Sequence, residues 1–109
     1  MKPLIALLLL LLTACTATPP QTVWIDVRSA DEYAAGHLVN TVNIPHTEIA
    51  AGVAKLNLSK DTPIAVYCKS GRRADVALET LQQLGYSNVI NKGGYEDLKQ
   101  KLNSEHERK

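Results

Sequence analysis

Short apolar runs alternate with helical patterns along most of this chain, and this alternation constrains the fold more than any other feature. The candidate strands are residues 23–27, 41–45, 62–68 and 86–91. The first and third are apolar along nearly their whole length, which is typical of parallel strands buried on both faces. We therefore predict an α/β domain in which a small parallel β-sheet carries helices on both faces. The alternation alone leaves the order of the strands open.

The helical patterns in the first half carry recognisable start and stop signals. Ser29 and Glu32 have the spacing of a capping box, and Gly36 is the expected stop of a short helix. A second helix is expected over 47–56, with Thr47 as its N-cap. The inward face of that second helix would carry Ile49, Val53 and Leu56.

The second half of the chain repeats the pattern. A long helix is predicted to begin at Arg73 and to stop at Gly85, with one apolar stripe. After the fourth strand, Gly93 and Gly94 indicate a turn, which a short helix follows. The polar residues 104–109 are expected to form a frayed tail. The long helix would point Ala74, Ala77, Leu78, Leu81 and Leu84 inward, and the short helix Tyr95, Leu98 and Leu102.

The first 14 residues have the layout of a secretory signal peptide. A positive start precedes an apolar run that ends at Leu12, which is shorter than the roughly 20 residues of a membrane-spanning helix. The sequence from Leu12 to Cys15 resembles a bacterial lipobox. That resemblance implies cleavage before Cys15 and lipidation of its sulfur and amino group. Residues 15–22 would then form a lipidated tether ahead of a domain at 23–103.

The lipobox resemblance also implies a location. The mature protein would face the periplasm, anchored by lipid to a bacterial membrane. Thr16 follows the cysteine in place of Asp, which resembles the signal for sorting to the outer membrane. An ordinary signal peptide with a chance cysteine and a buried N-terminal helix are the alternatives. If Cys15 carries lipid, Cys68 is the remaining thiol and has no partner for an intramolecular disulfide.

Length and charge exclude several other classes of protein. A chain of 109 residues is expected to form one domain, and its formal net charge of +1 gives no global field that would attract nucleic acid.

Positive charge instead gathers next to Cys68, between the third strand and the long helix. In parallel sheets, ligands bind at this edge. The residues that follow the cysteine there are Lys69, Ser70, Gly71, Arg72 and Arg73.

This loop has the composition of an anion cradle around a nucleophile. A loop that leads into a helix N-terminus points backbone N–H groups at one place, and Gly71 permits a tight turn. A free thiol has a pKa of about 8.5, and a helix N-terminus with cationic neighbours lowers it. Lys69, Arg72 and Arg73 would favour the thiolate and attract a small anionic substrate. The alternatives are a buried structural cysteine and a solvated basic turn.

Three motifs together give the chain a specific resemblance to one family. They are DVRSADEYAAGHLVNTVNIP at 26–45, the loop Cys68-x-x-Gly71-x-Arg73, and the segment GGYEDL at 93–98. All three resemble the signatures of the rhodanese family, and they cover most of the predicted domain. The likeness is greatest to small single-domain periplasmic rhodaneses of the phage-shock type.

The resemblance implies a ping-pong sulfurtransferase that needs no cofactor or metal. The Cys68 thiolate would take the outer sulfur of thiosulfate, release sulfite and become a persulfide. Cyanide or a thiol would then remove that sulfur, so the partners are a small anionic donor and such an acceptor. The chain departs from the family by having Tyr95 where Trp is common, and by lacking an additional N-terminal strand and helix. The absence of that strand would leave one edge of the sheet exposed.

Two other functions stay open. Cysteine-based phosphatases and arsenate reductases resemble Cys-x₅-Arg, whereas Cys68 and Arg73 enclose one residue fewer, which makes a smaller loop. A sulfur carrier or a membrane-tethered interaction module would use the same Cys68 with a protein partner. Asp26 and Arg28 are expected to support the site structurally. His37 is not needed as a general base for a preformed thiolate, and a monomer is the default.

Overall fold

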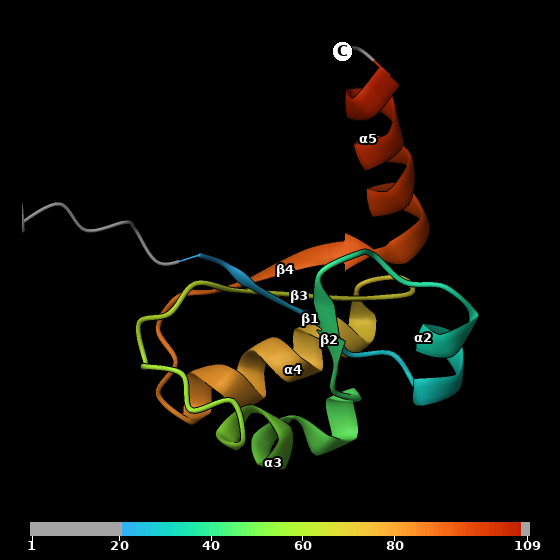
Figure 1. The fold of residues 1–109 in the computed structure, drawn as a ribbon. Coiled ribbons are helices and arrows are strands. Elements are labelled where there is room, and N and C mark those ends of the chain that lie inside the picture. The colour runs from blue at the N-terminus through green and yellow to red at the C-terminus, as the bar shows by residue number, and fades with distance from the viewer. Residues whose placement is uncertain (1–20, 108–109) are drawn as a thin grey trace, which may run out of the picture.

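The computed structural model describes residues 21–107, and their side chains as far as residue 104. The predicted signal peptide, Cys15 and most of the tether lie outside the described residues. The chain forms a four-stranded parallel sheet with the strand order β2-β1-β3-β4 (Figure 1). This confirms the predicted α/β class. The elements are β1 (Val23–Asp26), α2 (Ala30–Ala35), β2 (Thr41–Asn43), η3 (His46–Glu48), α3 (Ile49–Ala54), β3 (Ile64–Cys68), α4 (Arg72–Gln83), β4 (Val89–Gly94) and α5 (Tyr95–Glu107).

Strands β1 and β3 lie side by side in the centre of the sheet, and the chain leaves them in opposite directions. After β1 it passes through α2 to the edge strand β2, whereas after β3 it passes through α4 to the edge strand β4. The carboxyl ends of β1 and β3 therefore form a topological switch point, where open parallel sheets bind ligands. Asp26 and Cys68 end these two strands, and Arg28 follows closely, as the sequence predicted.

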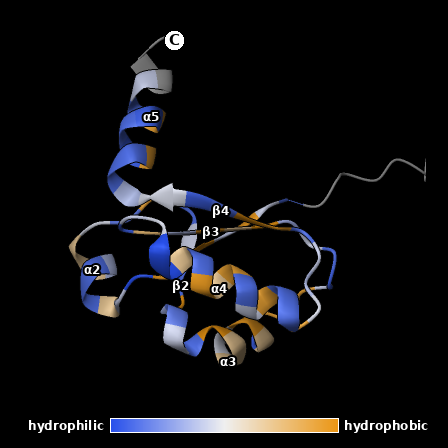
Figure 2. Cartoon of the chain, turned by 180° about the vertical axis from the view of Figure 1, so that it is seen from behind, coloured by the Kyte–Doolittle hydropathy of each residue, from blue (hydrophilic) through white to orange (hydrophobic). Residues whose placement is uncertain are grey.

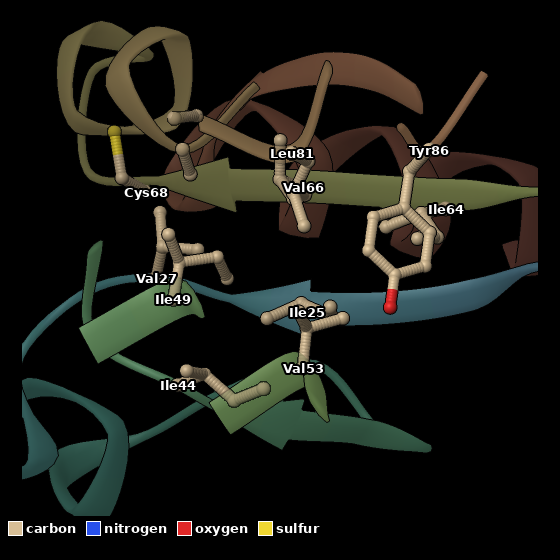
Figure 3. Packing of buried hydrophobic residues seen from close by; sticks show 12 residues of the cluster. Ile25, Val27, Ile44, Ile49, Val53, Ile64, Val66, Cys68, Leu81 and Tyr86 are labelled. Carbon is tan, nitrogen blue, oxygen red and sulfur yellow. The ribbon is translucent and has the colours of Figure 1, made fainter. Parts of the chain in front are cut away.

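The larger hydrophobic core lies between the sheet and helices α3 and α4, which Figure 2 shows together on one side of the sheet. Alternate strand residues point into it, among them Ile25 of β1 and Val66 of β3 (Figure 3). Because successive strand residues face opposite sides, Trp24 and Tyr67 point the other way. The helices contribute Ile49, Val53, Ala74, Ala77 and Leu81, as predicted.

A second, smaller core lies on the other face of the sheet. Leu38, Tyr67 and Leu98 are buried there, with Trp24 and Tyr95 packed against them. Burial raises the pKa of Tyr67 to about 12, so its hydroxyl stays protonated. That hydroxyl accepts a hydrogen bond from the Leu38 N–H at 3.3 Å. Helices thus lie on both faces of the sheet, but fewer side chains are buried on the face beneath α5 than on the face beneath α3 and α4.

The predictions for the first two helices were partly right. The capping box of α2 is present, with Ser29 as N-cap, Glu32 reaching back, and Gly36 after the last turn. Thr47 was wrongly predicted as an N-cap, because it lies inside the 3₁₀ turn η3. The hydrogen bond from the Glu48 N–H to the Pro45 carbonyl closes that turn. Glu48 is then the N-cap residue of α3, and its side chain makes no capping hydrogen bond.

The Gly-Gly pair does not form the predicted turn. Strand β4 runs through Gly94, which lies opposite Cys68 in the sheet. A Cβ atom on Gly94 would lie only 2.4 Å from the Lys69 carbonyl oxygen. Glycine is therefore needed at position 94 because the two backbones approach closely. The strand was also predicted to begin at Tyr86, but it begins at Val89, and Tyr86 is a core residue that precedes it.

Two apolar residues and the C-terminal tail also differ from the prediction. Leu84 follows the last turn of α4 and is 40% exposed, because it no longer shares the inward face. Helix α5 continues through Glu107, into the segment predicted as a frayed tail. No Gly or Pro interrupts it, and acidic residues in its first turn favour it. Its length carries Leu102 beyond the sheet, where the side chain is 49% exposed instead of inward.

Candidate active site

The loop between β3 and α4 curls around the sulfur of Cys68. Gly71 has a φ of +97°, a left-handed conformation that favours glycine, and it is the N-cap of α4. Its backbone N–H donates to the Cys68 Sγ at 2.9 Å. A backbone donor at the N-terminus of a twelve-residue helix thus faces the sulfur. This geometry stabilises negative charge on that atom.

Cys68 is fully buried at the end of β3. It belongs to the larger core together with Val27 and Ala74, and Figure 3 shows its sulfur pointing toward the overlying loop. The hollow of about 460 Å³ beside the loop is lined by Ser70, Arg72, Arg73 and Val76. A reagent reaches the sulfur from this side only if the loop side chains move.

Arg73 is held by a carboxylate from a distant part of the sequence. Its Nη1 and Nη2 atoms donate to the Glu32 Oε1 and Oε2 at 2.7 and 3.1 Å. This pair and hydrogen bonds from Ser29 lower the pKa of Glu32 from its ordinary 4.5 to about 2. The pKa of Arg73 is raised, chiefly by Glu32 and to a smaller extent by Cys68. Arg73 therefore connects the loop to α2, and its predicted substrate contact stays a prediction.

The other two cations of the loop are exposed on different sides of it. Neither Lys69 nor Arg72 takes part in an ion pair within the described part of the chain. Arg72 lines the hollow next to Ser70, whereas Lys69 lines another hollow of about 280 Å³ with Arg28 and Tyr95. Lys69 and Arg72 thus line separate hollows, and both are free to meet an anion.

Asp26 and Arg28 form a buried ion pair beneath the switch point. The carboxylate of Asp26 accepts from the backbone N–H, Nε and Nη2 of Arg28, the last at 2.7 Å. Arg28 also donates to the Gly36 carbonyl at 2.7 Å, and its guanidinium lies 4.3 Å from the centre of the Tyr95 ring. The hydrogen bond with Asp26 is the main reason that the pKa of Arg28 is raised. The pair ties the end of β1 to the start of α5, and its predicted support of the site stays a prediction.

Asn91 of β4 is a residue that the sequence analysis missed. Its Nδ2 donates to the Gly71 carbonyl at 2.9 Å and to the Asp75 carboxylate at 2.8 Å. Its Oδ1 accepts from the Gly93 N–H at 2.8 Å. Asn91 therefore fixes the same glycine that donates to Cys68. The only sequence signal was a polar residue at the end of an otherwise apolar strand.

His37 contacts the helix that precedes it, α2. The Nδ1 of His37 donates to the Tyr33 carbonyl at 2.7 Å, and the imidazole ring stacks on that tyrosine. Between residues 21 and 107 no three His, Cys, Asp or Glu side chains are grouped so that they could hold a metal ion. Within the same range, none of the helices is both long and apolar enough to cross a membrane.

The fold and the loop define a parallel α/β domain with a cysteine in a strand–loop–helix anion cradle. Residues 11–101 match the family described as Rhodanese-like domain. The chain therefore belongs to the rhodanese-like family, as its motifs suggested, and general sulfur-transfer chemistry is supported.

Individual relatives agree with this assignment. The chain is 37% identical over 75 residues to the thiosulfate sulfurtransferase PspE of Escherichia coli (strain K12), covering 69% of this chain and 72% of PspE. It is 36% identical over 67 residues to the putative sulfur carrier protein YrkF of Bacillus subtilis (strain 168), covering 62% of this chain and 35% of YrkF. A solved rhodanese with anions from E. coli superimposes with a TM-score of 0.67 at 36% identity, covering 71% of this chain and 91% of that one.

Proposed function

We propose that this protein is a thiosulfate sulfurtransferase that works through a Cys68 persulfide. The observation that carries the proposal is the Gly71 N–H held 2.9 Å from the Cys68 sulfur. A donor fixed on the sulfur stabilises the thiolate that attacks in the first step and the thiolate that leaves in the second, without reorganising during the reaction. The likeness to PspE, named as a thiosulfate sulfurtransferase, supports thiosulfate as the donor.

The proposed cycle has two displacement steps. The Cys68 thiolate attacks the outer sulfur of thiosulfate, the sulfur–sulfur bond of thiosulfate breaks, and sulfite leaves with the electron pair. The enzyme then holds a cysteine persulfide anion. Cyanide or a thiolate attacks the outer sulfur of that persulfide, which releases thiocyanate or a new persulfide and restores the Cys68 thiolate. Atoms and electrons balance without any further oxidant.

The side chains around the loop have separate roles in this proposal. Lys69 and Arg72 are exposed, and neither forms an ion pair with a carboxylate among the described residues. Their charges therefore attract the thiosulfate dianion. Arg73, held by Glu32, keeps the loop in shape. Ser70 is exposed and lines the hollow through which the donor would approach. Because Cys68 is buried at rest, the donor must displace side chains of this loop.

Mass spectrometry of the intact protein tests the function directly. After incubation with thiosulfate, we expect a mass gain of one sulfur atom, which maps to Cys68 and which cyanide removes as thiocyanate. The Cys68→Ser variant is the control and should gain nothing. A protein that gains no sulfur but hydrolyses a phosphate ester would contradict the proposal in favour of phosphatase chemistry.

A sulfur carrier is the second candidate, since YrkF is named as a putative carrier. Its persulfide would form on the same Cys68, but only a protein thiol would accept the sulfur. Turnover with small acceptors separates the two. Steady formation of thiocyanate supports the sulfurtransferase, whereas a persulfide that forms and then persists in excess cyanide supports the carrier.

We also propose that the protein is a lipoprotein held through Cys15 at a bacterial membrane, where it faces the periplasm and is sorted to the outer membrane. The support is the lipobox-like sequence from Leu12 to Cys15. The Cys15→Ser variant should lose acyl groups detectable by mass spectrometry, while Cys68→Ser should keep them. Absence of acylation from the unchanged protein would rule out the anchor.

A further inference from the structure

The two faces of the sheet are covered unequally. Helices α3 and α4 pack along one face, where the larger core lies. The opposite face meets only the first turns of α5 and the segment that leads into β2. Figure 1 shows α5 rising away from the sheet.

Two adjacent hollows occupy this less covered face. The larger, of about 470 Å³, lies between the sheet and α5, and the smaller, of about 140 Å³, lies beside it. Trp24 and Lys92 line both, so the hollows form one continuous surface, which we call the Trp24 face. Exposed apolar side chains gather on it: Val39 is 82% exposed, Ile90 54% and Leu102 49%. Such a contiguous apolar surface is typical of an interaction site.

The charges of the Trp24 face are all positive. Lys92 and Lys101 line the hollows, and no acidic residue of the described chain lines either of them. The Lys92 ammonium lies 5.8 Å from the centre of the Trp24 ring. A partner that fits this face must be apolar in the middle and negative at the rim. A second copy of the chain fits poorly, because two such faces would oppose lysines without a carboxylate between them.

The Trp24 face also lies where the proposed anchor would hold it. Thr22 lines the smaller hollow, and only residues 16–22 separate Cys15 from Val23. Even a fully extended chain of this length spans less than about 30 Å. A lipid on Cys15 would therefore keep this face within about 30 Å of the membrane surface.

We propose that the Trp24 face docks on the surface of a bilayer that contains anionic phospholipid. Trp24, Val39 and Leu102 enter the interfacial layer, and Lys92 and Lys101 contact the headgroups. This inference rests on the proposed lipid anchor. Cys68 belongs to the core on the opposite face of the sheet, so docking leaves its loop open to the aqueous phase.

Trp24 is the single tryptophan of the chain and reports on this docking. The lipidated full-length protein is reconstituted in vesicles of phosphatidylcholine, with or without phosphatidylglycerol. Flotation measures anchoring, and quenching of Trp24 fluorescence by lipids brominated on their acyl chains measures docking. We expect strong quenching in the anionic vesicles that falls in high salt, and little in the zwitterionic ones.

A matched pair of variants tests the charge argument. Lys101→Gln should lower the ratio of docked to undocked protein by about fivefold in anionic vesicles. Lys55→Gln makes the same change at an exposed lysine beside α3, on the other side of the sheet, and should leave quenching unchanged. Both variants should float like the unchanged protein.

The outcomes separate docking from anchoring. Protein that floats without quenching of Trp24 contradicts docking and leaves the anchor intact. Protein that does not float contradicts the anchor, and the docking proposal falls with it. Equal losses of quenching in the two variants also overturn the proposal, as does a shielded Trp24 in a dimer, which would make a second copy the occupant.

Discussion

Two arginine–carboxylate pairs hold the active-site edge of this protein, and they differ in burial. In the Asp26–Arg28 pair the two side chains are 0% and 7% exposed, whereas both partners of the Glu32–Arg73 pair are 32% exposed. The first pair fastens the end of β1 beneath the site, and the second joins the loop to α2 across 41 positions of sequence. Burial makes a pair costly to break, while exposure makes it easy to rearrange. We infer that the buried pair supports the fold and the exposed pair shapes the loop.

The largest effect is expected from breaking the buried pair. Asp26→Ala leaves the Arg28 guanidinium buried without its carboxylate, so the free energy of unfolding should fall by about 3–5 kcal/mol. Urea unfolding followed by circular dichroism measures the loss. Asp31→Ala removes an exposed carboxylate of α2 and is the control. A loss no larger than that of the control would show that the buried pair stabilises the fold no more than an exposed carboxylate does.

The next effect concerns the support of the loop from β4. Asn91→Ala removes the hydrogen bonds to Gly71 and Asp75, so we expect a stability loss of about 1–3 kcal/mol. Because Gly71 donates to the sulfur, kcat/KM for thiosulfate should fall at least about tenfold. Asn88→Ala, at an exposed position before β4, is the control. A kcat/KM that falls no further than that of the control would limit Asn91 to a purely structural role.

A smaller effect is expected from the exposed pair. Glu32→Gln keeps the shape of the side chain but removes its charge, so stability should fall by less than about 1 kcal/mol. Sulfur transfer should suffer more than stability, because Arg73 is then free to leave its place at the loop. Asp31→Asn makes the same charge change one residue away. Equal kcat/KM values in the two variants would argue against a role of the pair in shaping the loop.

The smallest effect is a dependence on pH in acid. The pKa of Glu32 in the folded protein, about 2, lies below its ordinary 4.5. The stability that the pair contributes is therefore complete above pH 4.5 and is lost as the pH falls toward 2. Unfolding curves of the unchanged protein and of Glu32→Gln should differ above pH 4.5 and converge below it. A constant difference down to pH 2 would contradict this pairing.

Much of the fold could be predicted because its signals are local. The capping box of α2 depends on two residues three positions apart, and the apolar stripe of α4 depends on one helix period. The loop from Cys68 to Arg73 could be placed for the same reason, since a strand precedes it and a helix follows. Long apolar strands between helices leave few alternatives to a parallel sheet.

The errors arose where distant segments meet. Gly94 was expected in a turn, but the Lys69 carbonyl lies too close to allow a Cβ atom. The ion pair of Arg73 went unpredicted, because its partner Glu32 lies far back in the sequence. Asn91 went unnoticed because its hydrogen bonds reach a loop that precedes it by 20 residues. None of these contacts leaves a periodic pattern in the chain.

The sequence by itself determined the class of the domain, the rhodanese-like family and the place of Cys68 between a strand and a helix. These depend on periodicity, caps and short motifs, which neighbouring residues define. Only the tertiary structure decided the strand order, the partners of Arg73 and Gly71, the burial of Cys68, and the unequal cover of the two sheet faces. Those features depend on which segments come together when the sheet closes and its two faces are packed.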